Sequence, residues 1–149
     1  MVATARKNES GLSLLETLVA LTILFIVFLG LADAGLLVLD FNINNAVRDE
    51  GVKVTEREMA TVRETPYATL NDAGTYPEGV AVQSPNGIVV PRQIRGLTVN
   101  YAPTWTVTRL NADNLQVAVN VTWTRNAWKP TGRELRNYSH QAITIVRNR

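Results

Sequence analysis

The sequence predicts an α+β protein in which one long N-terminal helix, membrane-spanning in its first half, packs on a small antiparallel β-sheet head. Three observations carry this prediction. Residues 11–39 are almost wholly apolar, residues 40–65 keep apolar side chains at helical spacing, and the segments after residue 80 alternate apolar with polar residues. The 149 residues suffice for one such helix and one small head, and the sequence contains no cysteine that could form a disulfide.

The apolar run, GLSLLETLVALTILFIVFLGLADAGLLVL, begins at Gly11 and ends at Leu39. The 21 residues that follow Gly11 are nearly all apolar, which is enough helix to cross a bilayer of about 30 Å at roughly 1.5 Å per residue. Their one charge, Glu16, costs roughly 2.5–3.5 kcal/mol at a membrane centre and less near its edge. Either Glu16 reaches water at the headgroups, or it finds a partner when this helix meets other helices; we favour the second.

The helix is predicted to continue beyond the apolar run. Residues 40–65 contain no proline and one glycine, Gly51, and their apolar side chains recur at helical spacing. We therefore predict one helix from about Leu12 to Thr65, ended by Pro66, because the residue before a proline is pushed out of the helical region. The alternative is two helices hinged at residues 40–45, where the sequence FNINN is a poor helix former.

Strands are predicted after a turn-rich connector at residues 67–79. The sequence VAVQSPNGIVV indicates two short strands around a Pro-Asn-Gly turn. Further strands are predicted at 97–101, stopped by Pro103, and at 104–110, 115–123 and about 135–146. Apolar side chains at alternate positions of 115–123 share one face: Leu115, Val117, Val119, Val121 and Trp123. The expected product is an antiparallel meander of three or four strands, its apolar face covered by the second half of the helix.

The residues before the apolar run form a short basic leader, MVATARKNES, which ends at Gly11. Basic leader, glycine, four uncharged residues, glutamate and a long apolar helix together resemble the class III signal of type IV pilins and type II secretion pseudopilins. The resemblance implies that a prepilin peptidase cuts between Gly11 and Leu12 and methylates the new amine of Leu12. It also implies that Glu16 pairs with such an amine during assembly. The family usually has Phe or Met at the position of Leu12, and many major pilins have a proline near the position of Asp33.

The same resemblance implies a domain organisation: a leader at 1–11, a transmembrane and filament-core helix at 12–39, an amphipathic continuation at 40–66 and a periplasmic β-sheet head at 67–149. The V-x-V-x-W strand, the basic loop and the last apolar strand are similar to those of minor pilins of the PilV type. A minor type IV pilin of the inner membrane, and later of the pilus, is therefore implied. Its implied partners are other pilins and minor pilins, prepilin peptidase, the inner-membrane assembly platform and, before assembly, membrane lipid. The alternatives are a minor pseudopilin of type II secretion and a competence-type minor pilin that binds DNA or another polyanion.

Charge is divided sharply along the chain. Residues 12–79 carry ten acidic and four basic side chains, whereas residues 80–149 carry two acidic and nine basic ones. We expect the acidic helix face around Asp49, Glu50, Glu56 and Glu58 to meet basic residues of a sheet, its own or a neighbour's. The alternative is that these basic residues stay exposed and bind nucleic acid or another polyanion. The candidate contact residues are Arg109, Arg125, Trp128, Lys129, Arg133 and Arg136.

The sequence indicates no enzyme, no cofactor and no metal site. His140 is the only histidine, and no phosphate-binding loop, nucleophile elbow or dinucleotide fingerprint occurs. The acidic pairs around Glu50 and Glu58 alternate with Arg48, Lys53 and Arg57, which is typical of a solvated, ion-paired helix face. Trp105 and Trp123 are predicted to be core residues because they lie on the apolar faces of strands.

Overall fold

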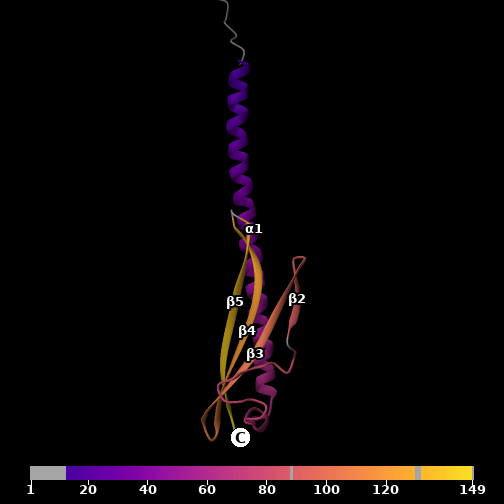
Figure 1. Ribbon diagram of the computed structural model, residues 1–149, viewed down its shortest axis with the longest axis vertical. Coiled ribbons are helices and arrows are strands. Elements are labelled where there is room, and N and C mark those ends of the chain that lie inside the picture. The colour runs from indigo at the N-terminus through magenta and orange to yellow at the C-terminus, as the bar shows by residue number, and fades with distance from the viewer. Residues whose placement is uncertain (1–12, 88, 130–131, 149) are drawn as a thin grey trace, which may run out of the picture. The chain divides into compact units, whose positions relative to one another are not determined.

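The computed structural model describes residues 13–87, 89–129 and 132–148. Helices and strands follow one another in the order α1 (Leu14–Glu64), α2 (Tyr67–Leu70), β1 (Ala81–Gln83), β2 (Val90–Ile94), β3 (Leu97–Asn111), β4 (Asn114–Lys129) and β5 (Gly132–Arg147) (Figure 1). Contacts divide the chain into two units, Met1–Leu39 and Asp40–Arg149, and each is described by itself. The second unit, called the head below, contains the sheet.

The helix α1 is uninterrupted from Leu14 to Glu64, so the predicted continuous helix is confirmed and no hinge occurs at residues 40–45. Its C-terminal end is where the sequence placed it. Pro66 has φ −58° and ψ 143°, which is extended backbone, and the short helix α2 starts directly after it. The poor helix formers at 41–45 are tolerated because the helix packs on the sheet from this point onward, and packing outweighs intrinsic propensity.

The sheet is antiparallel and has five strands in the order β1-β3-β4-β5, with β2 also paired to β3 (Figure 1). The three long strands β3, β4 and β5 form the predicted meander. The two short strands predicted around the Pro-Asn-Gly turn are present, but they do not pair with each other. Instead, β2 pairs with residues 97–101 of β3, where Val90 lies opposite Tyr101. The strand β1 pairs with residues 104–106 of β3, where Gln83 lies opposite Thr104.

The prediction that Pro103 stops a strand is wrong, because β3 runs through it from Leu97 to Asn111. The carbonyl of Pro103 accepts a hydrogen bond of 3.2 Å from the N–H of Ser84. The nitrogen of a strand residue points to the same side as its carbonyl, so the Pro103 nitrogen faces the β1 and β2 side and removes no hydrogen bond to β4. It lies in the gap between the parts of β3 that pair with β2 and with β1.

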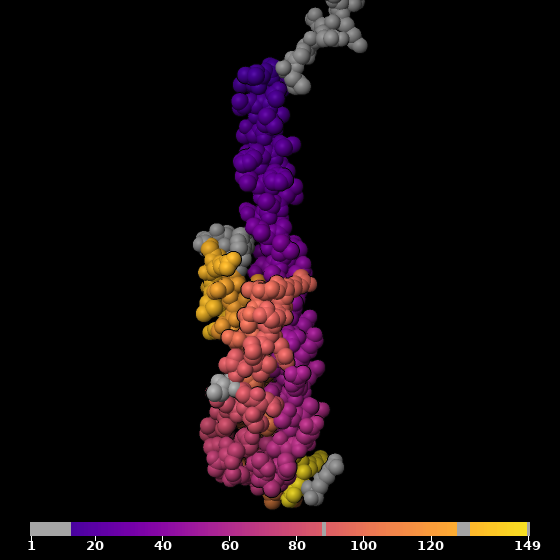
Figure 2. Space-filling view, turned by 90° about the vertical axis from the view of Figure 1, so that its right-hand side faces the viewer, coloured from indigo at the N-terminus to yellow at the C-terminus, as the bar shows by residue number. Residues whose placement is uncertain are grey.

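The core lies between the second half of α1 and one face of the sheet. The five residues predicted to share a face of β4 are at most 4% exposed. From β3, Tyr101 and Trp105 are fully buried, and Trp105 and Trp123 are confirmed as core residues. The helix contributes Val47, Val54, Met59 and Val62. Figure 2, which views the molecule from the β2 side, shows the rose-coloured segment that contains β1 and β2 gathered beside the magenta end of α1.

Candidate functional site

The start of α1 is capped by a serine that the sequence analysis overlooked. The Oγ of Ser13 accepts a hydrogen bond of 3.2 Å from the backbone N–H of Glu16, and its carbonyl accepts one of 3.1 Å from Thr17 N–H. Ser-x-x-Glu is the signature of a capping box, and it was available in the sequence. A carboxylate in the first turn also interacts favourably with the helix dipole. The predicted cleavage and methylation residues, Gly11 and Leu12, lie outside the described residues.

The apolar half of α1 has no cover from other described residues. Leu24, Phe25 and Phe28 are each more than 60% exposed, and α1 is long and apolar enough to cross a membrane. Two carboxylates, Glu16 and Asp33, lie in this half, and neither forms an ion pair with any residue that the structure describes. A surface of this kind is stable only in lipid or against other apolar helices.

The predicted basic contact residues do not form one surface. Arg109 is tied to the segment after α2, since its Nε donates to Asn71 Oδ1 at 2.9 Å and its Nη2 to the Asn71 carbonyl at 2.7 Å. Arg133 and Arg136 are exposed on β5, and Arg136 pairs with Glu134 at 3.2 Å. Glu134, and to a lesser extent Tyr138, raises the pKa of Arg136. Trp128 and Lys129 end β4, but their side chains are outside the described part of the chain.

Arg125 is not the exposed contact residue that the polyanion-binding alternative requires, but a link inside the head. Its side chain is 7% exposed and forms an ion pair with the carboxylate of Asp40. Its Nη1 also donates to Asn44 Oδ1 at 2.6 Å. The arginine therefore fastens β4 to the part of α1 that begins the head, and it is not available to a polyanion.

The acidic helix face differs from the prediction at Glu58. Glu50 does belong to an ion-paired surface, at 3.2 Å from Arg92 and 3.6 Å from Lys53. Glu58, by contrast, is 1% exposed, so its assignment to a solvated face is wrong. Its carboxylate accepts hydrogen bonds from Ser84 Oγ, from Trp105 Nε1 at 3.0 Å and from Asn86 Nδ2 at 3.2 Å.

The expected pairing of the acidic face with its own sheet occurs at Glu50, but its partner is Arg92 of β2, which is not one of the predicted basic residues. Among the described side chains, the acidic residues of that face do not contact the predicted basic ones. Pairing between neighbouring subunits stays a prediction. Glu58 differs from the prediction because its side of α1 faces the core between helix and sheet, where neutral donors hydrogen-bond to its carboxylate.

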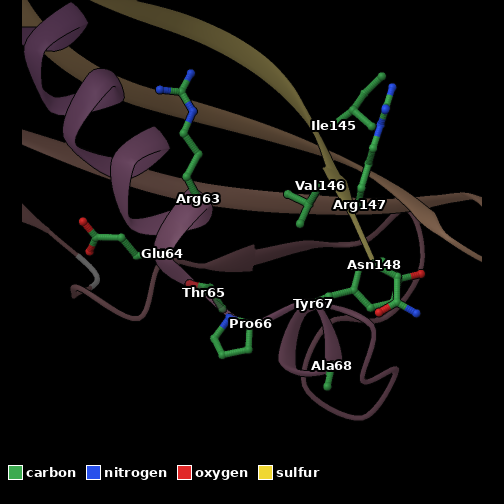
Figure 3. A pocket seen from close by; sticks show the side chains of 10 residues that line it. All are labelled: Arg63, Glu64, Thr65, Pro66, Tyr67, Ala68, Ile145, Val146, Arg147 and Asn148. Carbon is green, nitrogen blue, oxygen red and sulfur yellow. The ribbon is translucent and has the colours of Figure 1, made fainter.

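Two hollows lie where α1 meets β5. One, of about 330 Å³, is lined by Asn44, Asn45 and Arg48 from α1 and by Trp123, Tyr138, Ser139 and His140. The other, of about 760 Å³, lies between the end of α1, the start of α2 and the end of β5. Figure 3 shows Arg63 and Arg147 on either side of this second hollow. Within the described residues, no three histidine, cysteine or acidic side chains gather in a way that would hold a metal ion.

Comparison with known families gives one match. Residues 6–32 match the model of the prokaryotic N-terminal methylation motif, which covers the second half of the basic leader, Gly11, Glu16 and most of the apolar run. No curated protein and no solved structure matches the chain.

A methylation motif that leads into a long apolar helix, with the same helix continuing onto an antiparallel sheet, supports a pilin-like or pseudopilin precursor. The motif supports a type IV pilin-like family for this chain. This is a family of structural subunits, and the motif implies processing by prepilin peptidase and assembly with other pilins. The motif and the apolar helix fit a protein anchored in the inner membrane.

Proposed function

We propose that this protein is a minor type IV pilin that takes part in pilus assembly or initiation. The observation that carries the proposal is that the methylation motif leads into the apolar half of α1, which no other described residue covers and whose two carboxylates have no ion-pair partner among the described residues. The helix is held in the inner membrane with the head in the periplasm, and it leaves the bilayer for a bundle of similar helices. Its partners are other pilins, the minor pilins and the inner-membrane assembly platform.

Processing at Gly11 prepares the helix for this bundle. Glycine before the scissile bond has no side chain to obstruct an extended peptidase cleft. Cleavage leaves a cationic amine at Leu12, one residue before the Ser13 cap of α1. The carboxylate of Glu16 pairs with that amine, in its own or a neighbouring subunit, where a packed apolar bundle screens the attraction weakly.

The intact mass of the protein recovered from membranes or filaments tests this proposal. We expect a chain that starts at Leu12 and carries one methyl group on its amine. Replacement of Gly11 by a bulky residue should leave precursor in the membrane, while replacement of Ser13 by alanine should leave cleavage intact. A mature chain that still starts at Met1, or that has been cut after Ala34, contradicts the proposal.

A pseudopilin of type II secretion shares every feature named here. The two functions differ in whether the pilus or the secretion apparatus lacks a subunit when the protein is absent. Deleting the gene and measuring piliation and protein secretion side by side separates the two. The proposal expects piliation to fall and secretion to continue. The polyanion-binding alternative has less support, because Arg109 and Arg125 are both engaged inside the subunit.

A further inference from the structure

The strand β5 ends the sheet and leaves one long edge free. It spans Gly132–Arg147 and pairs with β4 along its whole length, whereas no other described strand pairs with it. Figure 1 shows β5 on the side of the sheet opposite β2. A free edge presents a row of N–H and C=O groups that can hydrogen-bond an added strand.

The groups that face the free edge can be assigned. The N–H of Asn148 donates to the carbonyl of Asp113, so the backbone of Asn148 faces β4. In an antiparallel ladder this direction alternates along the strand. The N–H and C=O groups of Ser139, Gln141, Ile143 and Ile145 therefore point to the free edge.

Nothing in the middle of β5 blocks an added strand. Proteins protect long edges with charges, proline or bulges, but residues 137–146 contain neither a charged residue nor a proline, and their register with β4 is regular. Ile143 and Ile145 are each 56% exposed. The opposite edge is protected in a different way, since its strands β1 and β2 have only three and five residues.

Arginines line two hollows along this edge, one at the middle of β5 and one at its C-terminal end. Arg48 lines the hollow beside Tyr138, and Arg63 and Arg147 line the hollow beside the end of β5. None of the three makes a hydrogen bond or ion pair with a described residue. The side chain of Glu64, which also lines the second hollow, points away from β5 (Figure 3).

We propose that the free edge of β5 is a docking site for an extended, acidic segment of a neighbouring subunit, which adds to the sheet as a further strand. That the segment belongs to a subunit of the same filament rests on the proposed function. Arg48 and Arg63 are about 22 Å apart along α1, and six residues of a strand span about 20 Å. The segment therefore carries two carboxylates six residues apart, on the same face of its strand, one for each hollow.

Titration of a labelled peptide, Thr-Glu-Thr-Val-Thr-Val-Thr-Glu-Thr, against the full chain in detergent micelles tests the docking without any filament. We expect saturable binding, which the same peptide with lysine in place of both glutamates does not show. Ile143→Pro removes an N–H that faces the free edge and no bond to β4, so it should weaken binding at least tenfold while the head stays folded. Ile143→Thr keeps that N–H and is the matched control.

Removing the guanidinium groups tests the two hollows. Arg48→Ala combined with Arg63→Ala should weaken peptide binding roughly five- to tenfold, the loss expected for two partly exposed ion pairs. Arg57→Ala, an exposed arginine of α1 that lines neither hollow, should leave binding unchanged.

Three results would overturn the proposal. The first is no binding of the acidic peptide at millimolar concentration, and the second is equal binding by the Ile143→Pro and Ile143→Thr chains. The third is a stable dimer of the chain that Ile143→Pro dissociates, because the edge would then belong to a second copy. Since cleavage at Gly11 is measured separately by mass, failure of docking and failure of the pilin proposal are distinguishable.

Discussion

At the scale of single residues, the head is held together by a buried carboxylate, Glu58, whose hydrogen-bond partners among the described residues are all neutral. Glu58 accepts hydrogen bonds from Ser84, Asn86 and Trp105, and Asn86 Nδ2 also donates to Thr61 Oγ1 at 3.0 Å. These contacts connect α1 to β3 and to the loop between β1 and β2. Hydrogen bonds from neutral donors to a charged acceptor are stronger than those between neutral groups, so one side chain fixes three segments.

Replacing Glu58 by alanine should therefore destabilise the head. The indole N–H of Trp105 and the hydroxyl of Ser84 would lose their acceptor inside the protein, which costs about 2–4 kcal/mol in the free energy of unfolding. Glu56→Ala is the matched control, because this exposed neighbour on the same helix should change stability by less than about 0.5 kcal/mol. Urea denaturation followed by tryptophan fluorescence measures both. Equal effects of the two substitutions would contradict the role of Glu58.

A second residue-scale prediction concerns alkaline pH. Tyr101 is fully buried and its hydroxyl donates to the Val47 carbonyl at 2.7 Å. Burial, with a smaller contribution from nearby Glu50, raises its pKa to about 12 from the usual 10.0. The folded state thus holds the proton more tightly, so this contribution to stability is complete below pH 10 and is lost as the pH rises toward 12.

The melting temperature should accordingly fall over that interval. Tyr101→Phe should melt lower at neutral pH, by the loss of about 1 kcal/mol for one hydrogen bond, and should show a shallower decline above pH 10. Some decline should remain, since burial also raises the pKa of Tyr76. An identical pH profile for the Tyr101→Phe and unchanged chains would refute the assignment.

At the scale of elements, the approach of α1 to β4 depends on one glycine. A Cβ atom built on Gly51 would lie 2.8 Å from two ring carbons of Trp123, closer than packed carbon atoms come. The indole ring stacks on Tyr138 on one side, with ring centres 5.9 Å apart, and contacts Tyr101 on another. The ring cannot move aside cheaply, so Gly51 sets the distance between helix and sheet.

Gly51→Ala is therefore expected to destabilise the head, although the same change at an open helix position stabilises by about 1 kcal/mol. Overpacking a rigid ring costs about 1–3 kcal/mol, which exceeds the gain in propensity. Gly51→Ala should cost less stability in a chain that already carries Trp123→Leu than in the unchanged chain, because the smaller side chain leaves room for the added methyl group. A double-mutant cycle measures this difference. A stabilised Gly51→Ala chain would show that the contact relaxes freely.

At the scale of the whole molecule, α1 serves two environments. Residues 40–64 pack on the sheet, and the apolar residues before them need lipid or neighbouring helices. The carboxylates Glu16 and Asp33 are costly in either apolar environment unless they are paired. This division fits a protein that is anchored in the inner membrane, and under the proposed function the apolar half would gain its helix contacts on assembly.

Replacing Glu16 by alanine should separate these two states. The variant should still be inserted and cleaved, since the span becomes more apolar. It should assemble poorly, because the partner amine would stay unpaired in an apolar bundle, a loss of about 3–5 kcal/mol if fully buried. Ser13→Ala, which removes the cap of α1 but keeps the carboxylate, is the control and should assemble nearly normally. Immunoblots of sheared filaments and membranes measure both steps, and normal incorporation of Glu16→Ala would argue against pairing.

The sequence by itself determined those features that rest on local periodicity. The apolar run to Leu39, the helix that continues to Glu64, and the inward face of β4 all follow from the spacing of apolar residues. The methylation motif is likewise local, because a peptidase recognises a contiguous segment. The Ser13 cap could have been recognised from its Ser-x-x-Glu spacing.

Only the tertiary structure decided the features that depend on which segments meet. The helix segment around Glu58 has the charged composition of a surface helix. Glu58 itself is buried because three donors from distant segments converge on its carboxylate. Pro103 is tolerated inside β3 because its nitrogen faces the gap between β1 and β2 rather than β4. Arg125 is likewise buried because it meets Asp40 across the head. Propensity and charge are properties of single positions, whereas burial and pairing depend on neighbours that the linear sequence does not specify.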